Sequence, residues 1–350
     1  MHRYHYIRLV TAMICMLCSN ACAVADEHVF NGTCDASAAV SVGNGYMLVA
    51  EDEHDLLLLY AINRPATDPV QRFDFSTQMR VEAGRESDIE GAARAGQRIY
   101  WITSHGRNAK GRLRANRYQL FATDVAGEST GEITLAWAGN YRSLIRDALD
   151  KASWESPEAR ETGRAIKLLR AATRLDEQVN KQLAPKADGL NIEALAAMPG
   201  GKGLLIGLRN PLDHGMALLL HLKNADDLLA GKAKRALFGG ARFVELGGLG
   251  LRSMAYSAVS GRFLIIAGPA ASGGPFRLYA WDSDAQGPPL RIRALDFSQG
   301  SHPEAVVLSG SRIHILHDDG SRILAGRVCK QGADKHFSVD STAVRLKISQ

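Results

Sequence analysis

Hydrophobic and polar positions follow a block pattern that recurs along the chain. Five stretches share one template: a polar opening, a short apolar run, a glycine-containing turn, a second apolar run, and polar residues again. They read CDASAAVSVGNGYMLVAED, SDIEGAARAGQRIYWITSH, LNIEALAAMPGGKGLLIGLRN, LGLRSMAYSAVSGRFLIIAG and SHPEAVVLSGSRIHILHDD. Short apolar runs joined by glycine turns predict β-hairpins, because glycine adopts the positive φ angles that tight hairpin turns require.

A third apolar run follows each predicted hairpin, and a fourth follows in several units. The third runs are DLLLLYAI, RYQLFATDV, MALLLHLK, FRLYAWDS and SRILAGRV, and fourth runs include EITLAWAG and LRIRALDF. Four strands per unit, recurring roughly every 50 to 60 residues apart from one insertion, predict the blades of an all-β propeller. Five blades are recognised directly, and a sixth can be assembled from VFNGT and FSVDSTAVRLKI. A pair of β-sandwich domains is the alternative, but it leaves the recurring polar openings unexplained.

Residues 141–188, between the second and third repeats, break the pattern. They are rich in alanine, leucine, arginine and glutamate, which favour helix. Apolar or small residues recur there at helical spacing: Leu144, Ala148, Ala152, Ile166, Leu169 and Thr173. We expect a helical insertion within one propeller domain that spans residues 26–350.

Residues 1–25 have the pattern of an export signal. Basic residues precede the short apolar run LVTAMICML, and the small residues AVA stand just before Asp26. Lipidation at Cys18 or Cys22 is the alternative. No later run is long enough to cross a membrane, so the expected mature chain is periplasmic or extracellular and has no transmembrane segment.

Removal of this signal leaves two cysteines, Cys34 and Cys329, near opposite ends of the mature chain. Exported proteins keep disulfides, so we predict a bond between them that joins the first repeat to the last. Two buried free thiols are the alternative. The chain of 350 residues has 42 basic and 37 acidic side chains, and this mild excess of positive charge does not predict a nucleic-acid partner.

The polar openings of the repeats carry the candidate chemistry. In a propeller blade, the start of the first strand and the end of the second lie on the same face of the disc. Alignment of the repeats places Ser37, Glu90, Glu193 and Glu304 at one position, with Arg252 or Ser253 in the fourth unit. The candidate acid–base residues are Glu90, His105, Glu193 and Glu304. The candidate ligand-binding residues are Asp88, Arg107, Arg209, Asn210, Arg252 and Asp318.

These residue types permit several kinds of site at one mouth of the channel. Carboxylates can hold Ca²⁺ or another divalent cation, and arginines bind phosphate or carboxylate groups through two hydrogen bonds. A histidine can act as an acid or a base. Alternatively, the charges pair with one another and only stabilise the strand ends. The basic loop HGRNAKGRLRANRY and the helical insertion are expected on the same face, where the insertion is a lid or a contact for a partner.

The openings around Glu90, Glu193 and Glu304 resemble a family of bacterial proteins known as domain of unknown function 3616 (DUF3616). The resemblance extends from about Asp35 to the mid-320s. More remotely, these openings resemble the esterase-like propellers grouped with phytases. That wider group implies a propeller of about six blades and, in some members, calcium-dependent hydrolysis of phosphate esters.

The sequence therefore predicts an exported propeller that binds a small anionic or polar ligand, with or without a divalent cation. Hydrolysis of a phosphate ester is an extension of this hypothesis. A non-catalytic scaffold that binds a protein or a cell-envelope partner through the helical insertion is the alternative. No nucleotide-binding loop, zinc-protease helix or nucleophile elbow occurs in the chain, so the residues do not decide whether it is an enzyme.

Overall fold

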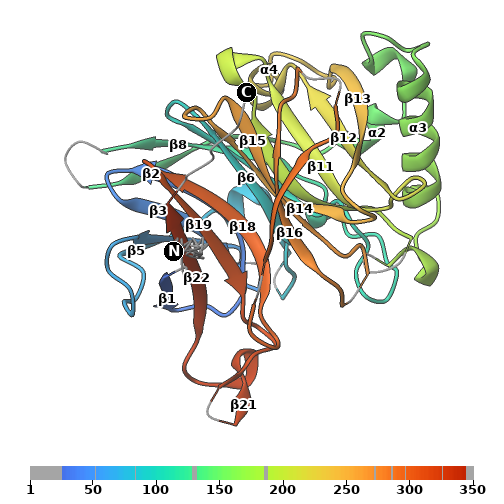
Figure 1. Cartoon of the computed structure of the whole chain (residues 1–350). Helices are drawn as coiled ribbons and strands as arrows, with labels where there is room; N and C mark the ends of the chain where they lie inside the picture. The colour runs from blue at the N-terminus through green and yellow to red at the C-terminus, as the bar shows by residue number, and fades with distance from the viewer. Residues whose placement is uncertain are drawn as a thin grey trace, which may run out of the picture.

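The computed structural model describes residues 26–343, apart from residues 52, 83, 128–131, 185–187, 272, 285–286, 296 and 325. The predicted export signal lies outside the described residues. The chain forms a β-propeller with five four-stranded antiparallel blades, as predicted (Figure 1). Each blade is made of short, largely buried apolar runs, and β-branched and aromatic residues favour such strands.

The first four blades follow the chain in order, from the channel outwards. The first contains β2 (Ala36–Gly43), β3 (Tyr46–Glu51), β4 (Leu56–Ala61) and β5 (Gln71–Asp74). The second contains β6 (Ile89–Ala95), β7 (Arg98–Thr103), β8 (Leu120–Ala126) and β9 (Thr134–Tyr141). The third contains β10 (Asn191–Ala197), β11 (Leu204–Asn210), β12 (Met216–Leu222) and β13 (Phe238–Glu245). The fourth contains β14 (Gly250–Ser257), β15 (Arg262–Gly268), β16 (Phe276–Trp281) and β17 (Leu290–Leu295).

The fifth blade joins the two ends of the described chain. It contains β18 (His302–Ser309), β19 (Arg312–Asp318), β22 (His336–Ala343) and β1 (Asp26–Asn31). The segments considered for a sixth blade are therefore β1 and β22, which pair with each other and complete the fifth blade. The five blades recognised in the sequence are therefore confirmed, and the possible sixth blade does not form, because β22 pairs with β19 and β1 pairs with β22. The N-terminal strand thus completes the last blade, and the inner strands β18 and β2 of the last and first blades pack against each other.

The five inner strands pack against one another in a closed circle. The contacts run from β2 to β6, β10, β14, β18 and back to β2. Small residues allow this close approach, and a side chain at Gly91 would begin 3.1 Å from Cβ of Leu195 on the neighbouring inner strand. The buried apolar side chains form clusters within and between adjacent blades, so the core is distributed around the ring.

The insertion between the second and third blades is helical, as predicted. It contains α2 (Leu144–Ala148), η2 (Lys151–Ser153), α3 (Arg160–Thr173) and η3 (Lys181–Leu183). α3 lies along the outer side of the third blade, where it contacts β13 (Figure 1). Its buried stripe includes Ile166 and Leu169, which join the core of the second and third blades. The other short helices are α1 (Ser76–Met79), η1 (Ala115–Arg117), η4 (Pro199–Gly201), α4 (Ala225–Leu229) and η5 (Cys329–Gln331).

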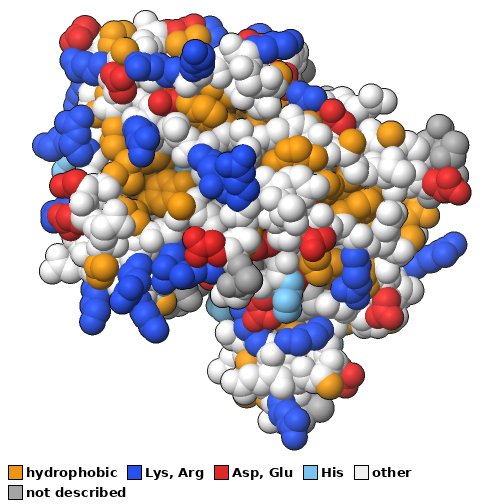
Figure 2. All heavy atoms as spheres, turned by 180° about the vertical axis from the view of Figure 1, so that it is seen from behind, with side chains coloured by type: hydrophobic (Ala, Val, Ile, Leu, Met, Phe, Trp, Pro, Cys, Tyr) orange, Lys and Arg blue, Asp and Glu red, His pale blue; other side chains and the backbone are white. Residues whose placement is uncertain are grey.

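A small hairpin projects from the fifth blade, below the body of the molecule in Figures 1 and 2. It contains β20 (Ile323–Leu324) and β21 (Arg327–Val328), which pair only with each other. The run SRILAGRV was predicted as the third strand of the last unit, but it forms this hairpin and β22 takes the third position. The hairpin contains too few residues between its turns to span a blade.

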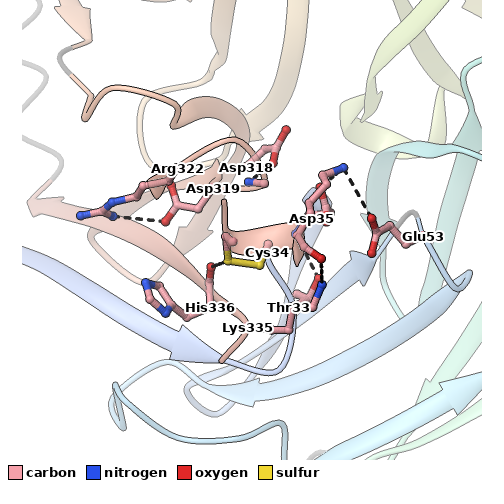
Figure 3. The surroundings of a disulfide bond; sticks show 12 residues. Thr33, Cys34, Asp35, Glu53, Asp318, Asp319, Arg322, Lys335 and His336 are labelled. Atoms are coloured by element: carbon pink, nitrogen blue, oxygen red, sulfur yellow. Dashed lines mark hydrogen bonds and ion pairs between the residues drawn. A yellow bond between two sulfur atoms is a disulfide. The ribbon is translucent and has the colours of Figure 1, made fainter. Parts of the chain in front are cut away.

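The predicted disulfide joins Cys34 to Cys329 (Figure 3). Both cysteines are buried, and 295 positions separate them in the sequence. The bond connects the chain just before β2 to the base of the projecting hairpin. Next to it in Figure 3, Arg322 pairs with Asp319, whose side chain is fully buried. Across residues 26–343, gaps excepted, none of the helices has the length and apolar character needed to cross a membrane.

Candidate functional site

Every inner strand contains a β-bulge at the same level, close to its first residue. The pairing of β2 with β3, for example, passes from Ala36 to Ala38 and skips Ser37. The residues skipped in the five blades are Ser37, Glu90, Glu193, Arg252 and Glu304. A bulge redirects a side chain out of the regular alternation of the strand. The repeat position identified in the sequence is therefore a ring of bulges, and its member in the fourth blade is Arg252.

This bulge ring lies in a cavity of about 600 Å³ at one mouth of the channel. Seven of the predicted site residues line the cavity: Asp88, Glu90, Glu193, Arg209, Arg252, Glu304 and Asp318. Ala109 of the basic loop and Ala184 of the insertion also line it. These two segments thus reach the face on which the sequence placed them.

On one side of the cavity, arginines and glutamates from three blades form a continuous chain of ion pairs. Nη1 of Arg209 donates a 2.8 Å hydrogen bond to Oε1 of Glu193, and Nε of Arg252 lies 3.0 Å from Oε2 of Glu193. Arg252 also pairs with Glu304. Burial lowers the pKa of Arg252, and the negative charge of Glu193 raises it by a smaller amount. The arginines therefore compensate buried carboxylates and hold three inner strands together.

Asp88 and Asp318 add further carboxylates to the cavity lining. Nη1 of Arg117 donates a 2.8 Å hydrogen bond to Oδ2 of Asp88, and Arg117 also pairs with Glu86. Burial raises the pKa of Asp88, and the positive charge of Arg117 opposes this rise in part. Asp318 accepts a 2.7 Å hydrogen bond from the backbone N–H of Gly320.

Asp35 stands beside the disulfide and also lines the cavity (Figure 3). Nζ of Lys330 pairs with its carboxylate and lies 3.8 Å from Oε1 of Glu53. The pKa of Asp35 is raised to about 6: burial raises it most, the contact with Lys330 lowers it, and the neighbouring Asp318 carboxylate raises it. The disulfide connects the residues that immediately adjoin this pair, so it holds Lys330 against Asp35.

Asn191 contributes an acceptor that receives no hydrogen bond from the described residues. Its Nδ2 donates a 2.7 Å hydrogen bond to Oε1 of Glu193. Its Oδ1 is buried and accepts no hydrogen bond from the described residues, although the side chain lines the cavity. A buried acceptor without a donor is costly, so this oxygen favours a ligand that donates.

The residues of the cavity do not fit a preformed calcium site of the kind that the phytase resemblance implies. Within the described ranges, three His, Cys, Asp or Glu ligand atoms come within 4.8 Å of one another only at Glu51, Glu53 and His54. None of these three residues lines the cavity. Divalent cations need several converging oxygen ligands, so we assign no chemical step to a metal in this cavity.

Arg107, a predicted ligand-binding residue, lies outside the cavity lining and has a structural role. Its guanidinium donates to the backbone carbonyls of Thr173, Arg174 and Glu177, at 3.0, 2.9 and 2.7 Å, and to that of Gly111. The carbonyls of Thr173, Arg174 and Glu177 stand at and beyond the C-terminal end of α3, where a cation is favourable. Arg107 thus anchors the helical insertion to the second blade.

His105 and Asn210 also lie outside the cavity lining. His105 is fully buried, its Nδ1 is 2.8 Å from the carbonyl of Thr103, and burial lowers its pKa to about 4. Asn210 is buried too and donates to the carbonyl of Gly189. His105 follows β7 and Asn210 is the last residue of β11, so both stand at the end of the second strand of their blades, but neither side chain lines the cavity. Their predicted roles at the cavity are therefore not supported by their positions.

Several cavity residues were missed as site residues in the sequence. Asp35, Asn191 and His302 line the cavity and stand two positions before the bulge of their blades, as Asp88 does. Extending the repeat alignment by two residues would have identified them. Arg117 was noted only as one cation of the basic loop. Lys330 gave no local signal, because its position depends on the disulfide and the projecting hairpin.

The fold and the cavity define a five-bladed β-propeller with a charged, polar cavity at one mouth of its channel. The chain belongs to the family described as Protein of unknown function (DUF3616), whose family model matches residues 35–294. The matched region includes the first four blades, whereas Glu304, Asp318 and Lys330 lie beyond it. No curated protein matches the chain.

Several solved structures resemble the chain at low identity. Glutaminyl cyclase of Myxococcus xanthus is 12% identical, with coverage of 91% of this chain and 97% of that chain and a TM-score of 0.42. The Cps50 (Swd1) β-propeller domain from Myceliophteria thermophila is 8% identical, with 90% and 98% coverage and a TM-score of 0.38. A bifunctional GH43-CE protein of Bacteroides eggerthii is 10% identical, with 85% and 33% coverage and a TM-score of 0.41. At these values, none of the three carries an argument about activity.

Proposed function

We propose that the protein binds a small polar ligand in the cavity at the mouth of the channel. The observation that carries this proposal is the ring of five β-bulges, which directs Ser37, Glu90, Glu193, Arg252 and Glu304 into one cavity of about 600 Å³. If these ion pairs had only a structural role, close packing around them would be sufficient and no cavity would be needed. A concave space with converging polar groups is instead typical of a small-molecule site.

Binding without catalysis is the function that the cavity supports best. Hydrolysis of a phosphate ester requires cations that can receive the phosphoryl oxygens. Arg209 and Arg252 are already paired with buried glutamates, and Arg117 is paired with Asp88. We therefore assign no nucleophile or general acid in this chain.

Binding is tested by calorimetry on the purified protein with a panel of sugars, amines, phosphate esters and CaCl₂. Glu90→Gln should weaken binding of the active compound at least about tenfold. The matched control is Glu158→Gln, since the Glu158 side chain is 84% exposed and lies on the insertion. Equal binding by the wild type, Glu90→Gln and Asp318→Asn would place the ligand outside this cavity and refute the proposal.

Export is part of the same proposal. The disulfide between Cys34 and Cys329 supports an oxidising compartment, since disulfides persist there and are rare in the cytosol. Mass spectrometry of the protein from the periplasm or medium should find an N-terminus at Asp26 and a linked Cys34–Cys329 peptide. Recovery only in the cytosol, with the first 25 residues retained, would contradict export.

A second candidate function is docking of an anionic partner on the helical insertion. The exposed face of α3 and its end carry Arg160, Lys167, Arg170 and Arg174, with Glu161 as the acidic residue on the same face. Figure 2 shows Lys and Arg side chains along the edge of the molecule on which α3 lies. The charge reversal Lys167→Glu/Arg170→Glu should abolish retention on an anionic resin at moderate salt. Unchanged retention would exclude this face as the docking surface.

A further inference from the structure

We propose that the ligand of the cavity is a small organic cation, with an ammonium group and further hydrogen-bond donors, rather than a phosphate or carboxylate compound. This inference rests on the proposed function and names the ligand class. Of the small anionic or polar ligand expected from the sequence, it departs from the anionic alternative, which rested on the arginines and not on how they are paired.

The charge balance of the cavity is the first observation. Among the described residues, six carboxylates line it: Asp35, Asp88, Glu90, Glu193, Glu304 and Asp318. The described Lys and Arg side chains that line it number four: Arg117, Arg209, Arg252 and Lys330. The formal balance is negative by two charges. Because walls of low dielectric strengthen this field, the cavity favours cations and disfavours anions.

The contacts of the four cations are the second observation. Arg209 and Arg252 pair with Glu193, and Arg252 also pairs with Glu304. Nε of Arg209 is further committed to the carbonyl of Pro269 at 3.0 Å. A phosphate could engage these guanidinium groups only by displacing a buried carboxylate, which would then lack compensation. The same holds for Arg117 with Asp88 and for Lys330 with Asp35.

The third observation is the set of groups that remain available to a ligand. Oδ1 of Asn191 is buried, lines the cavity and receives no hydrogen bond from the described residues. The only hydrogen bond described for Asp318 comes from one backbone N–H, that of Gly320. Both are acceptors, so the ligand must supply donors. An ammonium group supplies three donors and the missing positive charge.

The spacing of the carboxylates favours an ammonium group over a metal ion. As described above, the cavity does not bring three acidic or histidine ligand atoms within 4.8 Å of one another among the described residues. A metal ion must be surrounded at short range, whereas an ammonium group is stabilised by a dispersed negative field and a few acceptors. The dispersed arrangement therefore suits the organic cation.

Probes that share a skeleton but differ in charge test this inference by calorimetry at neutral pH and low salt. The first series is glucosamine, glucose and glucose 6-phosphate, and the second is ethanolamine with its neutral analogue ethylene glycol. We expect the cationic member to bind at least about tenfold more tightly than its neutral partner in at least one series. Glu90→Gln and Asp318→Asn should reduce this preference, and the control Glu158→Gln should retain it.

The possible results separate the two proposals. Preferred binding of glucose 6-phosphate that depends on Glu90 would overturn the cationic ligand but keep the cavity as a binding site. Binding of CaCl₂ that is lost in Glu90→Gln would also overturn it, in favour of a metal ion. Equal binding of charged and neutral partners would show that charge does not select the ligand. Absence of binding by every probe would overturn both the inference and the proposed function.

Discussion

Arg252 bridges two glutamates from different blades: its Nε lies 3.0 Å from Oε2 of Glu193, and its guanidinium also pairs with Glu304. The three residues occupy the same bulge position in the third, fourth and fifth blades. All are nearly buried, so each charge depends on its neighbours for compensation. The bridge thus connects the stability of the inner ring to the shape of the cavity.

Glu193→Gln should destabilise the protein more than Glu90→Gln. Removal of the Glu193 charge leaves Arg209 and Arg252 with reduced compensation, so we expect a loss of about 3 kcal/mol in the free energy of unfolding. Glu90 is half-buried, and its replacement should cost less than about 1 kcal/mol. Urea unfolding of both variants measures the difference. Equal losses would mean that the two glutamates have the same structural role.

Asp55→Asn should stabilise the protein at alkaline pH. Burial raises the pKa of Asp55 to about 6 from 3.8, although it accepts hydrogen bonds from Ser87. Because the pKa of Asp55 is higher in the folded than in the unfolded protein, its contribution to the free energy of unfolding is present below pH 4 and is lost as the pH rises through 6. Asparagine does not ionise, so the variant avoids this loss of stability, which is at most about 3 kcal/mol at pH 8. Asparagine also tolerates the positive φ of 57° at this position.

The measurement for Asp55→Asn is urea unfolding of the wild type and the variant at pH 4 and pH 8. The variant should gain stability relative to the wild type between these two values. A difference that does not change with pH would show that Asp55 has an ordinary pKa in the folded protein.

The buried histidines should lower stability in acid. Burial lowers the pKa of His314 to about 4. Nδ1 of His314 lies 2.7 Å from Oγ of Ser341 on β22, the strand that completes the fifth blade. The pKa of His105 is lowered to a similar value by burial. The unfolded chain binds protons at these sites from pH 6.5 downwards, so their contribution is present above 6.5 and is lost as the pH falls towards 4.

An NMR titration of the histidine ring protons checks this expectation. His314 and His105 should remain neutral down to about pH 5, whereas His54 should titrate above its ordinary value because Glu51 accepts from its ring. His54 serves as the internal control. Titration of His314 near 6.5 would contradict its buried position in the fifth blade.

Binding of an organic cation should weaken as the pH falls through about 6. Asp35 has a pKa of about 6 and faces Lys330, Asp318 and Glu53, so its protonation removes negative charge from the cavity. Ethanolamine is the appropriate probe, because its ammonium group donates hydrogen bonds and stays protonated at both pH 7.5 and pH 5. Calorimetry at pH 7.5 and 5 should show weaker binding at the lower value, and Asp35→Asn should flatten the dependence. An unchanged pH dependence in that variant would exclude Asp35 as its source.

Loss of the disulfide should affect both stability and the cavity. The bond closes a very long loop, so the chain-entropy account predicts a loss on the order of 5 kcal/mol for Cys34→Ser/Cys329→Ser. Lys330 and Asp35 adjoin the two cysteines, so their contact should also weaken. Thermal unfolding under non-reducing conditions compares the variant with the wild type. Because β1 and β22 still close the ring, we expect the variant to fold.

The sequence by itself determined most of the strands, the five repeats and the shared position of Glu90, Glu193 and Glu304. These features follow from local signals: alternating side chains, glycine turns and the spacing between them. Because each blade repeats the same local pattern, aligned positions must lie at one level of the channel. The bulge ring was accordingly predictable, even though the bulges themselves were not.

Only the tertiary structure decided how the ring closes and which charges are available. The pairing of β1 with β22, the position of Lys330 and the use of Arg107 at the end of α3 join segments that are distant in the sequence. The sign of the field in the cavity depends on which arginines meet which carboxylates. Such contacts are set by packing between blades, and no local pattern encodes them.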